Sequence, residues 1–369
     1  MSRRMTKKVY VLIVSTLLVR MVEKANADFV FGTPTNLGPT VNSLYGEGGV
    51  CISADELEFF FTSGRSGGYG AVDIWVMQRP TKEDDWGEPV NLGSPANSEY
   101  SYWEPSISSD GLSLYFSDGH LPQFGNHLPG GLGGQGDIWM ITRETLYDTW
   151  GAPVNIGPAV NSQHAVHPSI SADGLSLYFQ SHRPGRLGEH CDIMVATRET
   201  TSEPFANPVF LKNVSSNNGE WMPDISPDGL TIFFCRSSAT ELWMATRTTV
   251  NDDFGLPLRL PSQINLSPYG NNSPTLSPDG SMLYFSSNRP GGVGSYDLWQ
   301  VSIEPVVDLN GDGIVDAEDM CIIVDHWGTD EPLCDIGPMP WGDGIVDVED
   351  IIVLAEHLFE KLPGRPNQP

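Results

Sequence analysis

Oxygen-bearing side chains alternate along one short stretch near the C-terminus, "DLNGDGIVDAED" (308–319). Five of them fall at positions 1, 3, 5, 9 and 12 of a twelve-residue loop: Asp308, Asn310, Asp312, Asp316 and Asp319. Ile314 at position 7 would offer its backbone carbonyl, and Gly313 permits the turn. Ca²⁺ takes six or more oxygen ligands at this spacing, and so many carboxylates would repel one another without a cation. The stretch therefore predicts a calcium-binding loop.

A second copy of this pattern lies in "CDIGPMPWGDGIVDVEDIIVLAEHL" (334–358). At the spacing of the first loop, Met339 and Trp341 would take the first two ligand positions, and neither side chain binds Ca²⁺. A four-residue insertion restores Asp335 as the first ligand. The other predicted ligands of this second calcium site are Asp343, Asp347 and Asp350. Amphipathic helices are expected after the two loops, over 317–327 and 348–362.

Two loop–helix calcium repeats joined by a short linker resemble a type I dockerin, over about residues 306–362. The first loop matches the family pattern well, whereas the insertion in the second departs from it. The resemblance implies folding that depends on Ca²⁺, docking onto a cohesin-like module or a surface protein, and an association with polysaccharide breakdown. Cys321 and Cys334 flank a small segment of this region, and the sequence leaves open whether they form a disulfide.

A second group of chemically capable residues lies in five short, unequal stretches: "YGEGG" (45–49), "YSYWE" (100–104), "HAVH" (164–167), "GEWM" (219–222) and "GNNS" (270–273). Indole rings stack on the CH faces of sugars, while carboxylates and amides bind their hydroxyls. The predicted ligand-binding residues are Glu47, Tyr102, Trp103, Glu104, His167, Glu220, Trp221 and Asn272. The alternative is that the two tryptophans only cap the ends of strands.

Catalysis by these stretches would need two carboxylates flanking a scissile bond. A glycoside hydrolase places them about 5 Å apart for retention and about 6.5–9.5 Å apart for inversion. Glu104 and Glu220 are the best candidates for such an acid and base. The chain shows no motif for the first-strand acids of such enzymes, so we favour a binding function over a catalytic one. A zinc site would draw on four histidines whose spacing follows no metal motif: His120, His127, His182 and His190.

The elements that must position these residues recur five times. The repeated segments are "CISADELEFFF" (51–61), "SISSDGLSLYF" (106–116), "SISADGLSLYF" (169–179), "DISPDGLTIFF" (224–234) and "TLSPDGSMLYF" (275–285). A strand of the "DIW" type follows each, and a segment of the "PVNLG" type lies between units. Four short strands in each unit of 50–60 residues predict an all-β fold, a five-bladed β-propeller. One linker precedes the first unit and none follows the fifth, so residues 30–43 should supply the outer strand of the last blade and close the ring.

These repeats resemble the WD-like repeats of TolB-type propellers, over about residues 30–305. The resemblance implies the fold and leaves the activity open, because propellers host binding modules, hydrolases and scaffolds. Residues that every blade shares then have a structural explanation. The Asp-Gly pairs form the turns between first and second strands. An arginine after the second strand, such as Arg65, is expected to pair with the acid that begins the third, such as Asp73.

The N-terminus reads as an export signal. Four basic residues precede the apolar run "VYVLIVSTLLV" (9–19), and "ANA" (25–27) supplies a small-x-small cleavage pattern. The run is too short to span a bilayer comfortably, and no later run is long enough. We therefore expect a secreted or cell-surface protein with four parts: a signal peptide (1–27), the propeller (28–305), a small α-helical dockerin-like domain (306–362) and a tail (363–369).

The charge and cysteine content narrow the function further. The chain carries 20 basic and 47 acidic residues, and loss of residues 1–27 would leave 14 against 46. Such an acidic surface repels phosphate backbones, which argues against nucleic-acid binding. Five widely spaced cysteines do not make a disulfide framework, and Cys51 and Cys235 are expected to be buried. The sequence thus predicts a propeller that binds a carbohydrate or protein ligand, attached to a partner through its C-terminal domain. The alternatives are a glycoside hydrolase and a non-catalytic interaction scaffold.

Overall fold

The computed structural model describes residues 29–119, 128–132, 136–184, 190–236, 241–329, 331, 333–337 and 345–361. The chain divides into two compact units. One comprises Phe31–Ile303, and the other Glu304–Pro369 together with Met1–Val30. The first unit is built of β-sheets and the second contains two helices.

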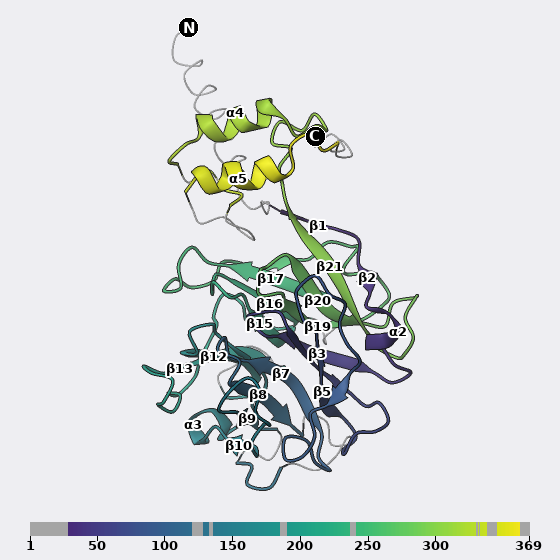
Figure 1. The fold of residues 1–369 in the computed structure, drawn as a ribbon. Helices are drawn as coiled ribbons and strands as arrows, with labels where there is room; N and C mark the ends of the chain where they lie inside the picture. The colour runs from purple at the N-terminus through teal and green to yellow at the C-terminus, as the bar shows by residue number, and fades with distance from the viewer. Residues whose placement is uncertain are drawn as a thin grey trace, which may run out of the picture. The chain divides into compact units, whose positions relative to one another are not determined.

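The larger unit is a five-bladed β-propeller (Figure 1). Blade 1 consists of β3 (Glu47–Ile52), β4 (Glu58–Ser63), β5 (Asp73–Gln78) and β6 (Val90–Asn91). Blade 2 consists of β7 (Tyr102–Ile107), β8 (Ser113–Asp118), β9 (Ile138–Thr142) and β10 (Val154–Asn155). Blade 3 consists of β11 (Val166–Ile170), β12 (Ser176–Ser181), β13 (Asp192–Thr197) and β14 (Val209–Phe210). Blade 4 consists of β15 (Glu220–Ile225), β16 (Thr231–Arg236), β17 (Glu241–Thr246) and β18 (Leu258–Arg259). Blade 5 consists of β19 (Asn271–Leu276), β20 (Met282–Ser287), β21 (Asp297–Pro305), β2 (Thr35–Asn36) and β1 (Phe29–Phe31). Neighbouring strands pair antiparallel, which confirms the predicted four-strand unit.

The five inner strands β3, β7, β11, β15 and β19 contact one another in a closed circle. The N-terminal end of the chain completes the last blade, as the offset of the repeats predicts. In β2, Thr35 and Asn36 pair with Gln300 and Trp299 of β21 (Figure 1). Short helices α2 (Gly38–Val41) and α3 (Pro158–Asn161) follow the outer strands of blades 5 and 2. Because first and last segments share one sheet, the ring has no open seam.

The core lies between the blades and is filled by the aromatic second strands. Phe59 of blade 1 meets Tyr284 of blade 5 with ring centroids 5.5 Å apart, and both side chains are buried. Burial of one such ring stabilises the fold by about 1.5–3 kcal/mol. Cys51 and Cys235 are buried as well, which confirms their predicted role as space-filling residues.

The Asp-Gly turns that join first and second strands follow the sequence prediction. In blade 2, the carboxylate of Asp110 accepts a hydrogen bond from the amide of Leu112, and Gly111 adopts φ of +71°. Blade 1 lacks the glycine, and Glu56 adopts φ of +58° in its place. A non-glycine residue in this region costs of order 1–3 kcal/mol, so the blade rather than the local sequence imposes this turn.

The second unit contains α4 (Ala317–Asp325) and α5 (Val348–Glu356), which are shorter than predicted. The chain leaves the helical conformation at the C-caps His326 and His357, and left-handed residues follow at Gly328 (φ +74°) and Phe359 (φ +71°). Cys321 is exposed and Cys334 is buried. Across the residues that the structure describes, we find no helix with the length and apolar character to cross a membrane.

Candidate functional site

Three of the predicted ligand-binding residues are engaged inside the blades rather than at the channel mouth. Glu220 is fully buried, with its Oε1 2.9 Å from Arg236 Nε and 2.6 Å from the hydroxyl of Ser216. Glu47, at the same position of blade 1, accepts hydrogen bonds from Ser63 and Arg65. Their carboxylates therefore fasten each first strand to its own blade.

Tyr102 is the third residue of this group. Its ring is fully buried and lies edge-on to Phe116 with centroids 5.2 Å apart, while its hydroxyl contacts that of Ser98. Burial raises the pKa of Tyr102 to about 12. Tyr102 thus packs in the core, and the prediction that it faces a ligand is not supported by its position.

The expected pairing of Arg65 with Asp73 is also wrong. Asp73 accepts hydrogen bonds from the amides of Tyr69 and Gly70 and from the side chain of Asn91. It therefore closes a Gly-rich loop, because its carboxylate accepts hydrogen bonds from the backbone amides of that loop. Arg65 instead pairs with Glu47 at 3.3 Å.

A bulge in each inner strand gives one residue beside the central channel a left-handed backbone conformation. The strand register shifts at the same place in all five blades, for example between Trp103 and Ser106. The residue at the start of each bulge has a positive φ between 48° and 56°: Gly49, Glu104, His167, Met222 and Ser273. Left-handed backbone at four non-glycine residues is strained, and it persists because the closed ring fixes it.

Glu104 extends across the channel from blade 2 to blade 5. Its Oε1 accepts a hydrogen bond of 2.7 Å from Ser273 Oγ. Glu104 also packs closely against Gly49 of blade 1. A Cβ atom added to Gly49 would lie only 2.8 Å from the Cα of Glu104, so this position has no room for a larger residue. Removal from water raises the pKa of Glu104 to about 7, and the bond from Ser273 opposes that rise. The carboxyl group is therefore poised between its protonated and ionised forms near neutral pH.

His167 lies in the same ring, with its orientation fixed by Gln180. His167 Nδ1 is 2.7 Å from Gln180 Oε1, and Gln180 Nε2 donates to Cys191 Sγ at 3.0 Å. Because the oxygen of Gln180 can only accept, Nδ1 carries a proton. His167 thus lies at the channel cavity.

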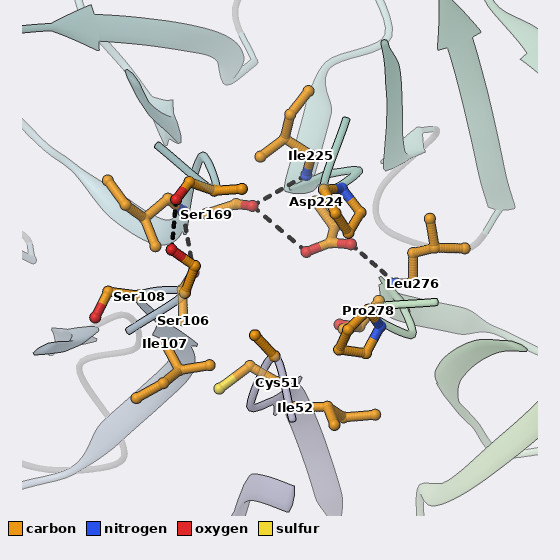
Figure 2. Close-up of a pocket in the computed structure, with 16 residues that line it drawn as sticks. Cys51, Ile52, Ser106, Ile107, Ser108, Ser169, Asp224, Ile225, Leu276 and Pro278 are labelled. Atoms are coloured by element: carbon orange, nitrogen blue, oxygen red, sulfur yellow. Dashed lines mark hydrogen bonds between the residues drawn. The ribbon is translucent and has the colours of Figure 1, made fainter. Parts of the chain in front are cut away.

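The second carboxylate of the channel is Asp224, which the sequence analysis overlooked. It lies two residues beyond Met222 in β15, and burial raises its pKa to about 7, with the charge of Glu104 adding to that rise. Asp224 Oδ2 accepts from the amide of Leu276 at 2.9 Å, and Oδ1 accepts from Ser169 Oγ at 3.4 Å (Figure 2). The sequence did contain a signal for Asp224, because this aspartate stands at a repeat position that the other four blades fill with Cys, Ser or Thr.

This position forms a second ring that links each blade to the next. Ser106 Oγ accepts from the amide of Ile170 at 3.0 Å, and Ser169 Oγ accepts from the amide of Ile225 at 3.0 Å (Figure 2). In blade 5 the direction reverses, and Thr275 Oγ1 donates to the carbonyl of Val50 at 2.8 Å. The ring thus connects the five inner strands around the channel axis.

The channel is closed to large molecules between these two rings. The cavity lined by Glu104, His167, Met222 and Asp224 measures about 10 Å³, roughly the space of one water molecule. A sugar ring cannot lie between Glu104 and Asp224 in this structure. The two carboxylates share a channel, but they do not flank a substrate-sized space.

Glu104 should therefore lower the stability of the propeller when it ionises. Its pKa is raised by folding from 4.5 to about 7, so its contribution is favourable at low pH and is lost as pH rises through about 7. At pH 8.5, Glu104→Gln should increase the free energy of unfolding by about 2 to 3 kcal/mol, with little change near pH 4. Urea unfolding at both pH values measures this difference. The matched control is the exposed Glu144→Gln, and equal stability of Glu104→Gln and wild type at pH 8.5 would contradict the assignment.

Trp103 and Trp221 directly precede the bulge residues of blades 2 and 4, and they are paired with Ser117 and Cys235. Both are partly exposed. The ring of Trp221 lies edge-on to that of His182, with centroids 6.4 Å apart. Asn272, partly exposed, takes the equivalent position in blade 5.

Of the histidines considered for zinc, His120 and His127 lie outside the described residues.

In the second unit, the two loop–helix segments are built alike. Asp319 accepts from the amides of Leu309 and Asn310, and Asp350 accepts from those of Ile336 and Gly337. This equivalence aligns Asp335 with Asp308, as the four-residue insertion requires. Asp316 and Asp347 cap the helices with the same capping box.

The loop over 308–319 is closed by its own acids. Asp308 accepts from the amides of Gly311, Asp312 and Gly313. Asp308 and Asp319 are buried, and neither forms a salt bridge with a lysine or arginine that the structure describes. Within the described ranges, no three His, Cys, Asp or Glu side chains are grouped as a metal site. Asp343 lies outside those ranges.

Comparison with known proteins gives similarity in structure alone. No family model and no curated protein matches the chain. The fold is similar to an α-L-arabinofuranosidase from Lactobacillus brevis, with 14% identity, TM-score 0.49, and coverage of 73% of this chain and 93% of that one. It is also similar to TolB from Acinetobacter baumannii, with 14% identity, TM-score 0.43, and coverage of 79% and 69%. It is similar as well to a thermostable family-43 glycoside hydrolase, with 13% identity, TM-score 0.49, and coverage of 73% of this chain and 92% of that one. At these values the likeness concerns the propeller fold and not its activity.

Proposed function

We propose that this protein is an exported, non-catalytic carbohydrate-binding propeller, attached to a partner by a calcium-dependent dockerin-like domain. The observation that carries the proposal is the placement of two partly exposed tryptophans at one position of blades 2 and 4, on either side of blade 3. Indole faces so placed offer stacking surfaces for sugar rings. Asn272, on blade 5, supplies donors and an acceptor for hydroxyl groups.

The hydrolase alternative has one observation in its favour. Glu104 and Asp224 both have pKa values raised to about 7, as a general acid requires. Against it, the pair proposed from sequence does not assemble, because Glu220 is buried against Arg236. The space between Glu104 and Asp224 also admits no sugar ring. A polysaccharide cleavage activity abolished by both Glu104→Gln and Asp224→Asn would favour the hydrolase.

For the C-terminal unit, we propose Ca²⁺ binding by the loop over 308–319. The donor set of carboxylates, one amide and one backbone carbonyl suits a hard cation of this size. The ligands would be Asp308, Asn310, Asp312, Ile314, Asp316 and Asp319. A second site would use Asp335, Asp343, Asp347 and Asp350, and it lacks a side-chain ligand at Gly337, which takes the place of Asn310.

Attachment to a cohesin-like or surface protein is supported by exposed apolar residues on the helices. Val348 and Ile352 lie one turn apart on α5 and are 55% and 54% exposed, and Val324 of α4 is 52% exposed. An exposed apolar face of this kind is typical of protein interaction sites. Capture of the full chain by a cohesin module in calcium would support this part of the proposal, and no capture by any cohesin tested would reject it.

Export would follow from residues 1–27, and analysis of the N-terminus of protein recovered from culture medium would test it.

Retention on insoluble polysaccharides tests the propeller proposal. Trp103→Ala and Trp221→Ala should each weaken retention by roughly 10-fold, because stacking of one aromatic ring is worth about 0.5–1.5 kcal/mol beyond its buried area. Tyr147→Ala is the control, since this tyrosine is 97% exposed in a turn of blade 2 that is distant in sequence from the first strands. Unaltered retention in the double tryptophan variant would favour the scaffold interpretation instead.

A further inference from the structure

The opposite end of the channel, where the Asp-Gly turns lie, opens into a funnel (Figure 2). Each blade contributes one residue to each of three layers. The floor is the second ring, namely Cys51, Ser106, Ser169, Asp224 and Thr275. The next layer is Ile52, Ile107, Ile170, Ile225 and Leu276. The rim is Ala54, Ser109, Ala172, Pro227 and Pro278. The sequence analysis assigned these residues to the scaffold.

The floor of the funnel has one charged group. Asp224 points to its centre (Figure 2), and none of the described residues that line the cavity is a lysine, arginine or histidine. The carboxylate accepts only from Ser169 and the amide of Leu276, and a carboxylate has about four acceptor positions. Ser106 Oγ accepts from one amide and retains a second lone pair. The only thiol on the floor, Cys51, is kept neutral because burial raises its pKa. The floor therefore favours a positively charged group with several donors.

The volume of the funnel limits the size of the ligand above the floor. Of the four isoleucines and one leucine that line it, Ile52, Ile107, Ile225 and Leu276 turn their side chains away from the middle of the cavity (Figure 2). Ile52, Ile170 and Ile225 belong to hydrophobic clusters between blades. The cavity measures about 120 Å³. An apolar cavity of about 150 Å³ holds a benzene ring, so this one suits a short alkyl chain and excludes a sugar ring. The net charge of −27 adds a long-range attraction for cations.

We propose that this funnel binds a primary alkylammonium group, with the ammonium on Asp224 and the alkyl chain directed along the cavity toward the rim. The ammonium donates hydrogen bonds to Asp224 and to the lone pair of Ser106. This site does not include the tryptophans proposed to bind carbohydrate, and it stands whether or not they bind a glycan. A free amine and the side chain of a lysine in another protein present the same chemistry.

Calorimetric titration of the full chain tests the proposal with n-butylammonium as probe and n-butanol as its neutral control. The titrations are done at about pH 8.5, since burial raises the pKa of Asp224 to about 7 and the carboxylate must be ionised. We expect n-butylammonium to bind at least about 10-fold more tightly than n-butanol. Asp224→Asn should weaken n-butylammonium by about 10-fold to 100-fold and leave n-butanol unchanged.

A second variant keeps the proposal testable if Asp224→Asn fails to fold. Ala172 is an exposed rim residue, so Ala172→Trp should cover the opening without entering the core and abolish binding of n-butylammonium. Equal binding of the amine and the alcohol, or amine binding unchanged in either folded variant, would overturn the proposal. Binding of N-acetyl-lysine methylamide as well would identify a lysine side chain as a possible source, whereas binding of n-butylammonium alone would identify a free amine.

Discussion

Arg236→Leu should destabilise the propeller by about 3 to 5 kcal/mol, because it leaves the carboxylate of Glu220 buried without its cation. In the folded protein the two side chains are 11% and 0% exposed and 2.9 Å apart. The pKa of Glu220 is already raised by burial, and Arg236 opposes that rise. Denaturant unfolding of the full chain measures the loss.

The control for this prediction is an exposed pair in the same blade. Arg259 and Glu241 are 3.0 Å apart but 40% and 31% exposed, so Arg259→Leu should cost no more than about 1 kcal/mol. Replacing both members of the buried pair, with Glu220→Gln and Arg236→Met, should recover much of the lost stability, because no charge is then left unpaired. If Arg236→Leu costs no more than Arg259→Leu, Glu220 is not the structural group described here.

Removal of calcium should increase amide hydrogen exchange in α4 and α5 by about 100-fold. A ligand at 100 times its dissociation constant stabilises the folded form by about 2.7 kcal/mol, and that contribution is lost when a chelator removes it. The buried carboxylates Asp308 and Asp319 would then repel each other without a cation between them. Exchange of the full chain, measured by mass spectrometry with calcium and with EGTA, tests this prediction.

Two controls separate a calcium effect from a general one. Amides of the propeller strand β8 should exchange equally in both conditions, because that strand belongs to the other unit. Asp308→Asn in calcium should resemble the wild type in EGTA. Identical exchange of α4 and α5 with and without calcium would contradict the calcium proposal.

The sequence predicts the blades well because one turn and one strand pattern recur five times. The Asp-Gly turns and aromatic strands are local features, and their period determines the number of blades. The N-terminal closing strand β2 also follows from counting linkers against units. These predictions need no knowledge of where any individual side chain points.

The channel was harder to predict, because its members are selected by a bulge. Glu104 and Glu220 look alike in the sequence, yet the first lies at the bulge and the second two residues before the equivalent position in β15. One joins the channel while the other pairs with Arg236. A usable signal was present, since proline follows the bulge residue in four blades, and proline within a strand often marks a bulge.

Asp224 was missed for a related reason. It belongs to a position that the other blades fill with Cys, Ser or Thr, inside the segment that looked like pure scaffold. Its importance depends on the five inner strands meeting around one axis, which no single repeat reveals. In the C-terminal unit, by contrast, the predicted alignment of Asp335 with Asp308 follows directly from the chain, because Asp319 and Asp350 bind equivalent amides.

The most direct test of the account is to measure binding and cleavage in the same samples. The protein is incubated with a panel of insoluble polysaccharides, and both the bound protein and the reducing sugar released are determined. We predict retention on at least one polysaccharide, weakened by Trp103→Ala with Trp221→Ala, and no sugar release above the blank. Release of sugar that disappears in Glu104→Gln, or failure to bind any polysaccharide in the panel, would contradict the account.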